Sequence, residues 1–254
     1  MPFSTFSSQH TPLNRIFSTS VAAVVSSGLI CHLKTAPPTG STWTDDVGNS
    51  NATLANSPTY SSSDGGYISL NGSNQYVMTS TSLNAQISGT SPNKSTAQSI
   101  FIWCYPTEQG VIVSEIGQPT INTAWHDSNI EMSSGGLISF SVWHGSMVNR
   151  VTSTSRSFNA WYNLGWTYSG TTLTAYINGT SVGTATLTRQ APFNNGFNLH
   201  YALGATDATN MGEGSYCAMR VGSFQVYNRA LTDGEVATNF NSNRTIYGLL
   251  AEAI

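Results

Sequence analysis

Two groups of aromatic and imidazole side chains could recognise a ligand. Trp125-His126-Asp127 and Trp143-His144 border the same predicted β-hairpin, each at a strand end. Exposed aromatic rings offer an apolar face on which a sugar ring can stack, and neighbouring amide or carboxylate groups can bond its hydroxyls. The sequence therefore predicts a glycan-binding group made of Trp125, His126, Asp127, Trp143 and His144. The alternative is that either tryptophan caps the core or is buried in a subunit interface.

Glycoside cleavage is the other chemistry to consider for such a surface. It needs two facing carboxylates, about 5 Å apart for retention or roughly 6.5–9.5 Å apart for inversion. The nearest candidates, Asp127 and Glu131, are predicted to flank a loop-to-strand junction rather than to face one cleft. The one G-x-S-x-G match, at 179–183, starts in the Asn178-Gly179 hairpin turn and not in a strand-to-helix elbow, and the five histidines never take an H-E-x-x-H spacing. We therefore expect no enzymatic activity.

The composition is poor in charge. Charged residues make up 8% of the 254 residues, against about 25% in ordinary soluble domains. With a net charge of -3 and scattered Lys and Arg, the chain has no basic field for a phosphate backbone, so we expect no nucleic-acid binding. No apolar run approaches the roughly 20 residues of a membrane helix. So neutral a surface favours a protein packed in a larger assembly or one that faces carbohydrate.

Short alternating segments separated by turn signals predict an all-β fold. From about residue 21 onward the apolar runs are strand-like, and turns such as Asn178-Gly179 lie between them. We expect strands at 130–132, 137–143, 162–168, 173–177 and 221–227. Thr232-Asp233-Gly234-Glu235 has the form of a capping box, which predicts a helix that ends near Asn243. The prediction is an antiparallel β-sandwich over residues 21–254 with a short C-terminal helix.

Residues 1–20 form a separate N-terminal arm in this prediction. They show no periodicity, yet they carry the apolar side chains of Phe3, Phe6, Leu13, Ile16 and Phe17. Such a segment needs a surface to lie on, since free termini are otherwise poorly ordered. We expect the arm to dock on its own domain or on a neighbouring subunit, and the chain to form a homo-oligomer.

Several motifs resemble, in order, those of one protein family. They are GSTWTD at 40–45, GGYISLNG at 65–72, SIFIWCYP at 99–106, the segment 161–179 with its closing Asn-Gly, and VYNRALTDGEV at 226–236. Together they cover about residues 28–249 and resemble laminin-G-like modules of the concanavalin A-like lectin/glucanase superfamily. The resemblance implies a concanavalin A-like jelly roll, in which Trp43, Trp103, Trp161 and Trp166 are expected to be apolar anchors of the core.

The same resemblance bears on metals and on catalysis. Relatives often hold one calcium ion on loops at the rim of the sandwich, which implies Asp45, Asp46, Asp127 and Asn129 as candidate ligands. Turn formation is the commoner role of such residues, so we expect no cofactor, with calcium as the alternative. The superfamily's glucanases carry their acids in an E-x-D-x-x-E run, and this sequence has none.

Modules of this kind are common on virion proteins of phages and large viruses and on secreted adhesins. The resemblance and the low charge lead us to expect a non-enzymatic virion surface protein, such as a capsid decoration, spike or fibre component. Its expected partners are other virion proteins or further copies of itself, bound through residues 1–20, and host-surface glycans. The alternative is a secreted carbohydrate-binding module or adhesin.

Overall fold

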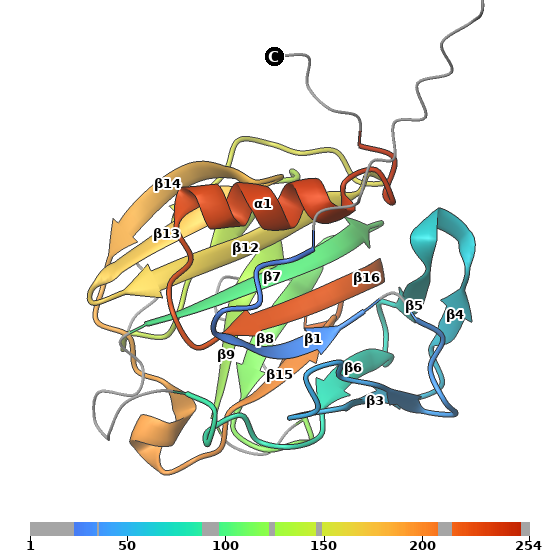
Figure 1. The fold of residues 1–254 in the computed structure, drawn as a ribbon, viewed down its shortest axis with the longest axis horizontal. Coiled ribbons are helices and arrows are strands. Elements are labelled where there is room, and N and C mark those ends of the chain that lie inside the picture. Colours follow the sequence, from blue (N-terminus) through green and yellow to red (C-terminus); the bar gives the residue numbers. More distant parts are fainter. Residues whose placement is uncertain are drawn as a thin grey trace, which may run out of the picture.

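The computed structural model describes residues 23–34, 36–87, 97–121, 125–145, 149–207 and 215–249. In this part of the chain the strands form two antiparallel sheets that pack face to face, with one α-helix on the outside (Figure 1). The predicted all-β sandwich with a short C-terminal helix is therefore confirmed. The predicted arm at residues 1–20 lies outside the described residues.

The first sheet, called sheet A, is centred on two ten-residue strands. Its strand order is β14 (Thr180–Thr186), β13 (Thr172–Ile177), β12 (Tyr162–Ser169), β7 (Ala97–Pro106), β16 (Ala218–Tyr227), β5 (Tyr67–Asn71) and β4 (Thr59–Ser61), and β1 (Leu29–Leu33) also pairs with β16. The hairpin between β13 and β14 turns at Asn178 and Gly179, whose φ angles are 52° and 77°. Two positive φ angles define the expected type I′ turn.

The second sheet, called sheet B, faces the first across the core. Its strand order is β11 (Val151–Thr152), β10 (Ile138–Phe140), β9 (His126–Met132), β8 (Gly110–Ile116), β15 (His200–Leu203), β6 (Tyr76–Thr79), β3 (Ala52–Ala55) and β2 (Thr42–Trp43). Two short 3-10 helices lie in the connections, at Ser63–Gly65 and Pro192–Asn195. The strand expected at 137–143 is shorter than predicted, since only Ile138–Phe140 forms β10.

Alternation along the strands decides which side chains fill the core. In β7 the residues Ile100, Ile102 and Cys104 face sheet B and are fully buried. Since side chains alternate between the two faces of a strand, Trp103 must then point to the outer face of sheet A. Each apolar side chain buried in this way stabilises the fold by about 1.5–3 kcal/mol relative to exposure.

The four tryptophans expected in the core are all buried, but they divide between two layers. Trp43 and Trp166 lie between the sheets. Trp103 and Trp161 instead form a cluster on the outer face of sheet A, where Tyr247 stacks on Trp103 with ring centroids 4.4 Å apart. The expectation that all four lie in one core was wrong for Trp103 and Trp161. Side chains alternate between the two faces of sheet A, and these two point to its outer face.

The helix α1 (Asp233–Asn243) covers part of that outer face and lies across β12 and β13 (Figure 1). Its predicted capping box is present: Glu235 N donates to Thr232 Oγ1 at 3.3 Å, and Thr232 N donates to Glu235 Oε2 at 2.9 Å. Arg229 donates to both carboxylate oxygens of Glu235 at 2.8 and 2.6 Å. These hydrogen bonds hold the pKa of Glu235 at about 2, and they tie the helix start to the end of β16.

Candidate functional site

The structure brings the two predicted tryptophan-histidine groups together. β9 begins at His126, and the ladder with β10 pairs Ile130 with Phe140 and continues through the bond from Ser141 N to Asn129 O at 3.0 Å. The start of β9 therefore lies beside the segment that follows β10. Trp125, His126, Trp143 and His144 are all half-buried there. We call these four residues the Trp-His rim.

Asp127 lies beneath the rim rather than in it. Its side chain is 0% exposed, and its Oδ2 accepts hydrogen bonds from the backbone N of Trp143 at 2.6 Å and from Asn129 Nδ2 at 2.9 Å. A carboxylate without solvent contact cannot bond a sugar hydroxyl, so we assign Asp127 the role of positioning Trp143. Trp143 is held on its other side too, because Gln190 N donates to Trp143 O at 2.5 Å.

His126 and His144 have different partners. His126 Nδ1 lies 3.8 Å from a carboxylate oxygen of Asp207, and His144 Nδ1 lies 3.1 Å from the carbonyl oxygen of Val142. Each imidazole thus has one nitrogen directed at a fixed group of the protein.

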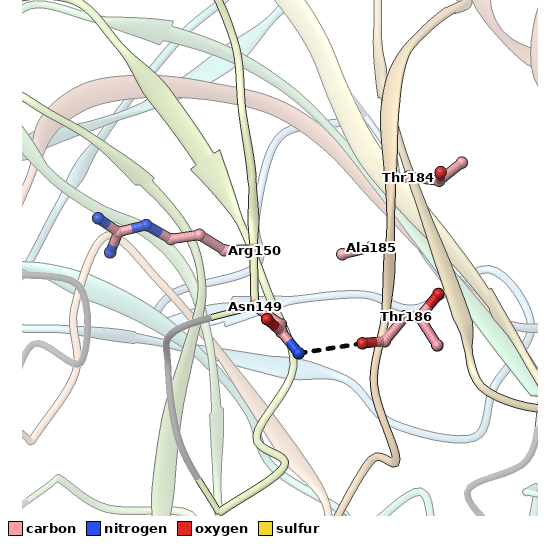
Figure 2. Close-up of a pocket in the computed structure, with 5 residues that line it drawn as sticks. All are labelled: Asn149, Arg150, Thr184, Ala185 and Thr186. Atoms are coloured by element: carbon pink, nitrogen blue, oxygen red, sulfur yellow. Dashed lines mark hydrogen bonds between the residues drawn. The ribbon is translucent and has the colours of Figure 1, made fainter.

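An open polar hollow of about 370 Å³ lies between β14 and the residues just before β11. It is lined by Asn149, Arg150, Thr184, Ala185 and Thr186. Figure 2 shows the Asn149 amide turned toward β14, where Nδ2 donates to Thr186 O at 3.2 Å. Asn149, two residues before β11, is therefore anchored to β14.

A buried ionic network lies between the sheets under this end of the molecule. Arg189 donates from Nη2 to Glu115 Oε1 and from Nη1 to Gln98 Oε1, and its guanidinium lies 5.4 Å from the ring centroid of Trp166. Tyr201 Oη donates to Glu115 Oε1 at 3.0 Å. Arg189 and Glu115 have side chains with 0% exposure. Gln98 and Trp166 belong to sheet A, and Glu115 and Tyr201 to sheet B, so the network joins the two sheets.

The network also reaches the rim. Asp127 pairs with Glu115 in the β8–β9 ladder, and its charge is one of those that raise the pKa of Arg189. Burial raises the pKa of Glu115, while Arg189 and the Tyr201 hydroxyl act in the opposite sense. Asp127 thus interacts with the buried charge of Arg189 and also with the backbone of Trp143. Buried charge therefore lies directly under the half-exposed Trp143.

The residues of this network were not predicted from the sequence. Glu115 is the one charged residue of β8, whose other side chains are apolar apart from Ser114, and a lone carboxylate in such a strand is a signal of a buried charge that needs a partner. Arg189 lies in an irregular segment after β14, and nothing in its local sequence marks it as that partner.

The four residues proposed as calcium ligands are not brought together. Asp45 and Asp46 follow β2 at one edge of sheet B, whereas Asp127 and Asn129 belong to β9, near the other edge. Asp46 forms an exposed ion pair with Lys34. Across the described ranges, three or more His, Cys, Asp or Glu side chains nowhere gather as they would around a metal ion.

Asp45 instead organises its own loop. Its Oδ1 accepts from His32 N at 2.7 Å and Val47 N at 3.0 Å, and its Oδ2 accepts from Asn49 N at 2.8 Å and Ser50 N at 2.9 Å. The side chain is buried, and each oxygen already accepts two hydrogen bonds. This is the structural, turn-forming alternative that the sequence left open.

The fold agrees with what a family comparison finds. A laminin G family model, described as the concanavalin A-like lectin/glucanases superfamily, matches residues 71–237. This match covers more than half of the chain, which therefore belongs to that superfamily. No curated protein matches the chain in sequence.

Similar solved structures share the fold at low sequence identity. Trypanosoma rangeli sialidase in complex with sialic acid superposes with a TM-score of 0.62 and 17% identity over 89% of this chain, but only 34% of the sialidase. The binding domain of botulinum neurotoxin DC in complex with rat synaptotagmin II gives a TM-score of 0.60 and 14% identity over 85% of this chain and 52% of that one. The chain thus spans about a third of the sialidase and about half of the neurotoxin domain. In the described residues, no helix is both long and apolar enough to cross a bilayer.

Proposed function

We propose that this chain is a non-enzymatic surface protein that binds glycans through the Trp-His rim. The observation that carries the proposal is the contrast among its tryptophans. Trp43, Trp103, Trp161 and Trp166 are buried, whereas Trp125, just before β9, and Trp143, after β10, are half-exposed, with the backbone of Trp143 fixed from both sides. A rigid aromatic ring flanked by polar groups suits a sugar ring, because little side-chain entropy is lost on binding.

The placement of the carboxylates supports a binding role rather than hydrolysis. Glu115 and Asp127 face each other across β8 and β9, yet both are 0% exposed and lie against Arg189, where no sugar can reach them. The accessible carboxylates of Asp64 and Glu235 form ion pairs with arginines. Neither arrangement offers the general acid and nucleophile that glycoside cleavage needs. A glycan that binds the protein is therefore expected to be recovered intact after incubation with it.

Replacing Trp143 by alanine tests the proposal. We expect the affinity for the best ligand on a glycan array, measured by titration calorimetry, to fall at least about tenfold, because the stacking face is lost. Trp125→Ala is expected to weaken binding in the same direction. Addition of EDTA should leave the affinity of the unmodified protein unchanged, since the proposal assigns no metal ion to the site.

Leu137→Ala provides the matched control for both tryptophan variants. Leu137 is a large apolar residue in the turn between β9 and β10, and it is 42% exposed. Its replacement should leave glycan affinity within about twofold of the unmodified protein, since surface substitutions of this kind perturb the fold little. Equal binding by the Trp143→Ala variant and the unmodified protein would contradict the proposal.

We also propose that the module is carried on a virion surface, as a capsid decoration, spike or fibre component; secretion as an adhesin is the alternative. Support comes from the 8% charged composition, which suits a protein held at high density, and from the apolar side chains of residues 1–20. The similar structures include proteins bound to sialic acid or to synaptotagmin II, and either kind of ligand suits surface recognition.

Light scattering tests the assembly role of residues 1–20. The full chain is expected to form oligomers whose mass rises with concentration, and a chain that starts at Val21 is expected to be monomeric. Monomers in both samples would count against the virion role and leave the secreted glycan-binding module.

A further inference from the structure

Arg220 lies on the outer face of sheet A, between two tyrosines. Its neighbours Met219 and Val221 are buried in the core, so the side chain of Arg220 points the other way. Arg220 pairs directly with Tyr105 of β7, and Tyr67 of β5 lies diagonally across the other side of β16. The guanidinium carbon Cζ is 4.5 Å from the ring centroid of Tyr105 and 4.9 Å from that of Tyr67. Two cation–π contacts therefore hold the guanidinium between the rings.

The two tyrosines are supported by Trp161. Its ring centroid lies 6.1 Å from that of Tyr67 and 5.6 Å from that of Tyr105, and both pairs meet edge to face. Trp161 itself belongs to the buried cluster that contains Trp103 and Tyr247. Arg220 thus rests on a well-packed aromatic base, so a ligand that contacts it has little side-chain motion left to restrict.

This part of sheet A is accessible. The helix α1 lies across β12 and β13, and β5 and the start of β16 lie to one side of it (Figure 1). The Arg220 side chain is 35% exposed, and Tyr67 and Tyr105 are half-buried. A ligand that approaches here therefore meets a guanidinium flanked by two phenol rings.

Asp64 is a weak internal partner of Arg220. It lies in the 3-10 turn at Ser63–Gly65 between β4 and β5, and its Oδ2 is 3.3 Å from Arg220 Nη1. Charge-assisted hydrogen bonds are usually shorter, at about 2.7–2.9 Å. The Asp64 side chain is 47% exposed, and ion pairs as exposed as this one contribute little to stability. The carboxylate of a ligand can therefore replace Asp64 at low cost.

The residue types favour a protein ligand over a sugar. One face of each tyrosine ring is already covered by the Arg220 guanidinium, which leaves less ring surface on which a sugar can stack. Tyrosine, tryptophan and arginine are the residues most enriched at the centres of protein–protein interfaces. The buried indole nitrogen of Trp161 also has no hydrogen-bond partner in the part of the chain that the structure describes, and a peptide carries many carbonyl acceptors.

We propose that the surface formed by Tyr67, Tyr105 and Arg220 binds an acidic segment of a protein partner. An aspartate or glutamate carboxylate of that segment bonds the Arg220 guanidinium in place of Asp64, and the flanking residues pack on the two tyrosines. This surface belongs to sheet A, whereas the Trp-His rim belongs to sheet B. The inference therefore goes beyond glycan binding and does not depend on it.

A peptide array probed with the full chain tests this inference. The retained peptides should be rich in Asp and Glu. In solution, the best of them should bind at least about tenfold more tightly than its Asn/Gln counterpart, and added salt should weaken it. In NMR spectra this peptide should shift the indole N–H signal of Trp161 and leave that of Trp143 in place.

Three variants locate the bound carboxylate. Arg220→Gln should lower the affinity for the acidic peptide at least about tenfold. Asp64→Asn should raise it about threefold, because a competing carboxylate is lost while asparagine tolerates the same φ of 48°. Arg150→Gln is the matched control: Arg150 is an exposed arginine at the polar hollow, and its loss should leave the affinity unchanged.

An array that retains no acidic peptide, or an Arg220→Gln variant with full affinity, would overturn the inference. A shift of the Trp161 signal by trigalacturonate but not by any acidic peptide would mean that the site binds an acidic sugar, and the protein partner would be wrong. Arg220→Gln should still bind glycans, and Trp143→Ala should still bind the acidic peptide. Failure at one surface is therefore distinguishable from failure at the other.

Discussion

Replacing Arg189 by methionine is expected to lower the free energy of unfolding by about 3–5 kcal/mol. Arg189 and Glu115 are completely buried and share a hydrogen bond, so methionine leaves the Glu115 carboxylate without a counter-charge inside the sandwich. The same substitution leaves Gln98 Oε1 without its donor. Urea unfolding followed by tryptophan fluorescence measures the change.

The double variant Arg189→Met/Glu115→Gln shows whether the loss of unfolding free energy comes from the unpaired charge of Glu115. A neutral glutamine still accepts from Tyr201, so we expect the double variant to recover more than half of the loss. Lys34→Met, which breaks an exposed pair, should change stability by no more than about 0.5 kcal/mol. A single Arg189→Met variant as stable as the unmodified protein would refute the buried network.

Replacing Asp45 by alanine is expected to cost about 3 kcal/mol of unfolding free energy. The carboxylate accepts four backbone hydrogen bonds in a buried loop, and alanine leaves all four N–H groups without that acceptor. Asp45→Asn keeps one oxygen acceptor and should fall between alanine and the unmodified protein. Thermal and urea unfolding measure both variants.

Asp46→Ala is the control for this loop. Asp46 is the next residue, but it is exposed and forms a surface ion pair with Lys34, so its loss should cost no more than about 0.5 kcal/mol. Comparing the melting temperature in calcium with that in EDTA shows whether Asp45 organises the turn or binds calcium. A melting temperature that falls in EDTA for the unmodified protein, but not for Asp45→Ala, would mean that Asp45 binds calcium instead.

The sequence was informative wherever a local pattern determines a local structure. The Asn178-Gly179 turn, the capping box at Thr232 and Glu235, and the strands expected at 130–132, 162–168, 173–177 and 221–227 were predicted correctly, because each depends on residues a few positions apart. The proximity of the two tryptophan-histidine groups followed from one hairpin. For that reason the residues of the rim could be named from the sequence, whereas their burial and their contacts could not.

Long-range pairings could not be predicted in the same way. Arg189 meets Glu115 and Gln98 across separations of 74 and 91 residues, and no periodicity links such positions. The burial of Asp127 depends on which way β9 faces, and the sequence around it did not determine this. Trp103 was assigned to the wrong layer for a related reason, since an apolar residue on either face of β7 is buried, either by sheet B or by α1 and Tyr247.

The central claim, that glycans bind at the Trp-His rim, is tested most directly by NMR of the tryptophan indoles. The chain has six tryptophans, and each gives one indole N–H signal that can be assigned by single substitutions. On titration with a bound glycan, we predict that the signals of Trp125 and Trp143 shift while those of Trp43, Trp103, Trp161 and Trp166 stay in place. Shifts confined to the cluster under α1, or no shift at Trp143 with a glycan that demonstrably binds, would contradict the account.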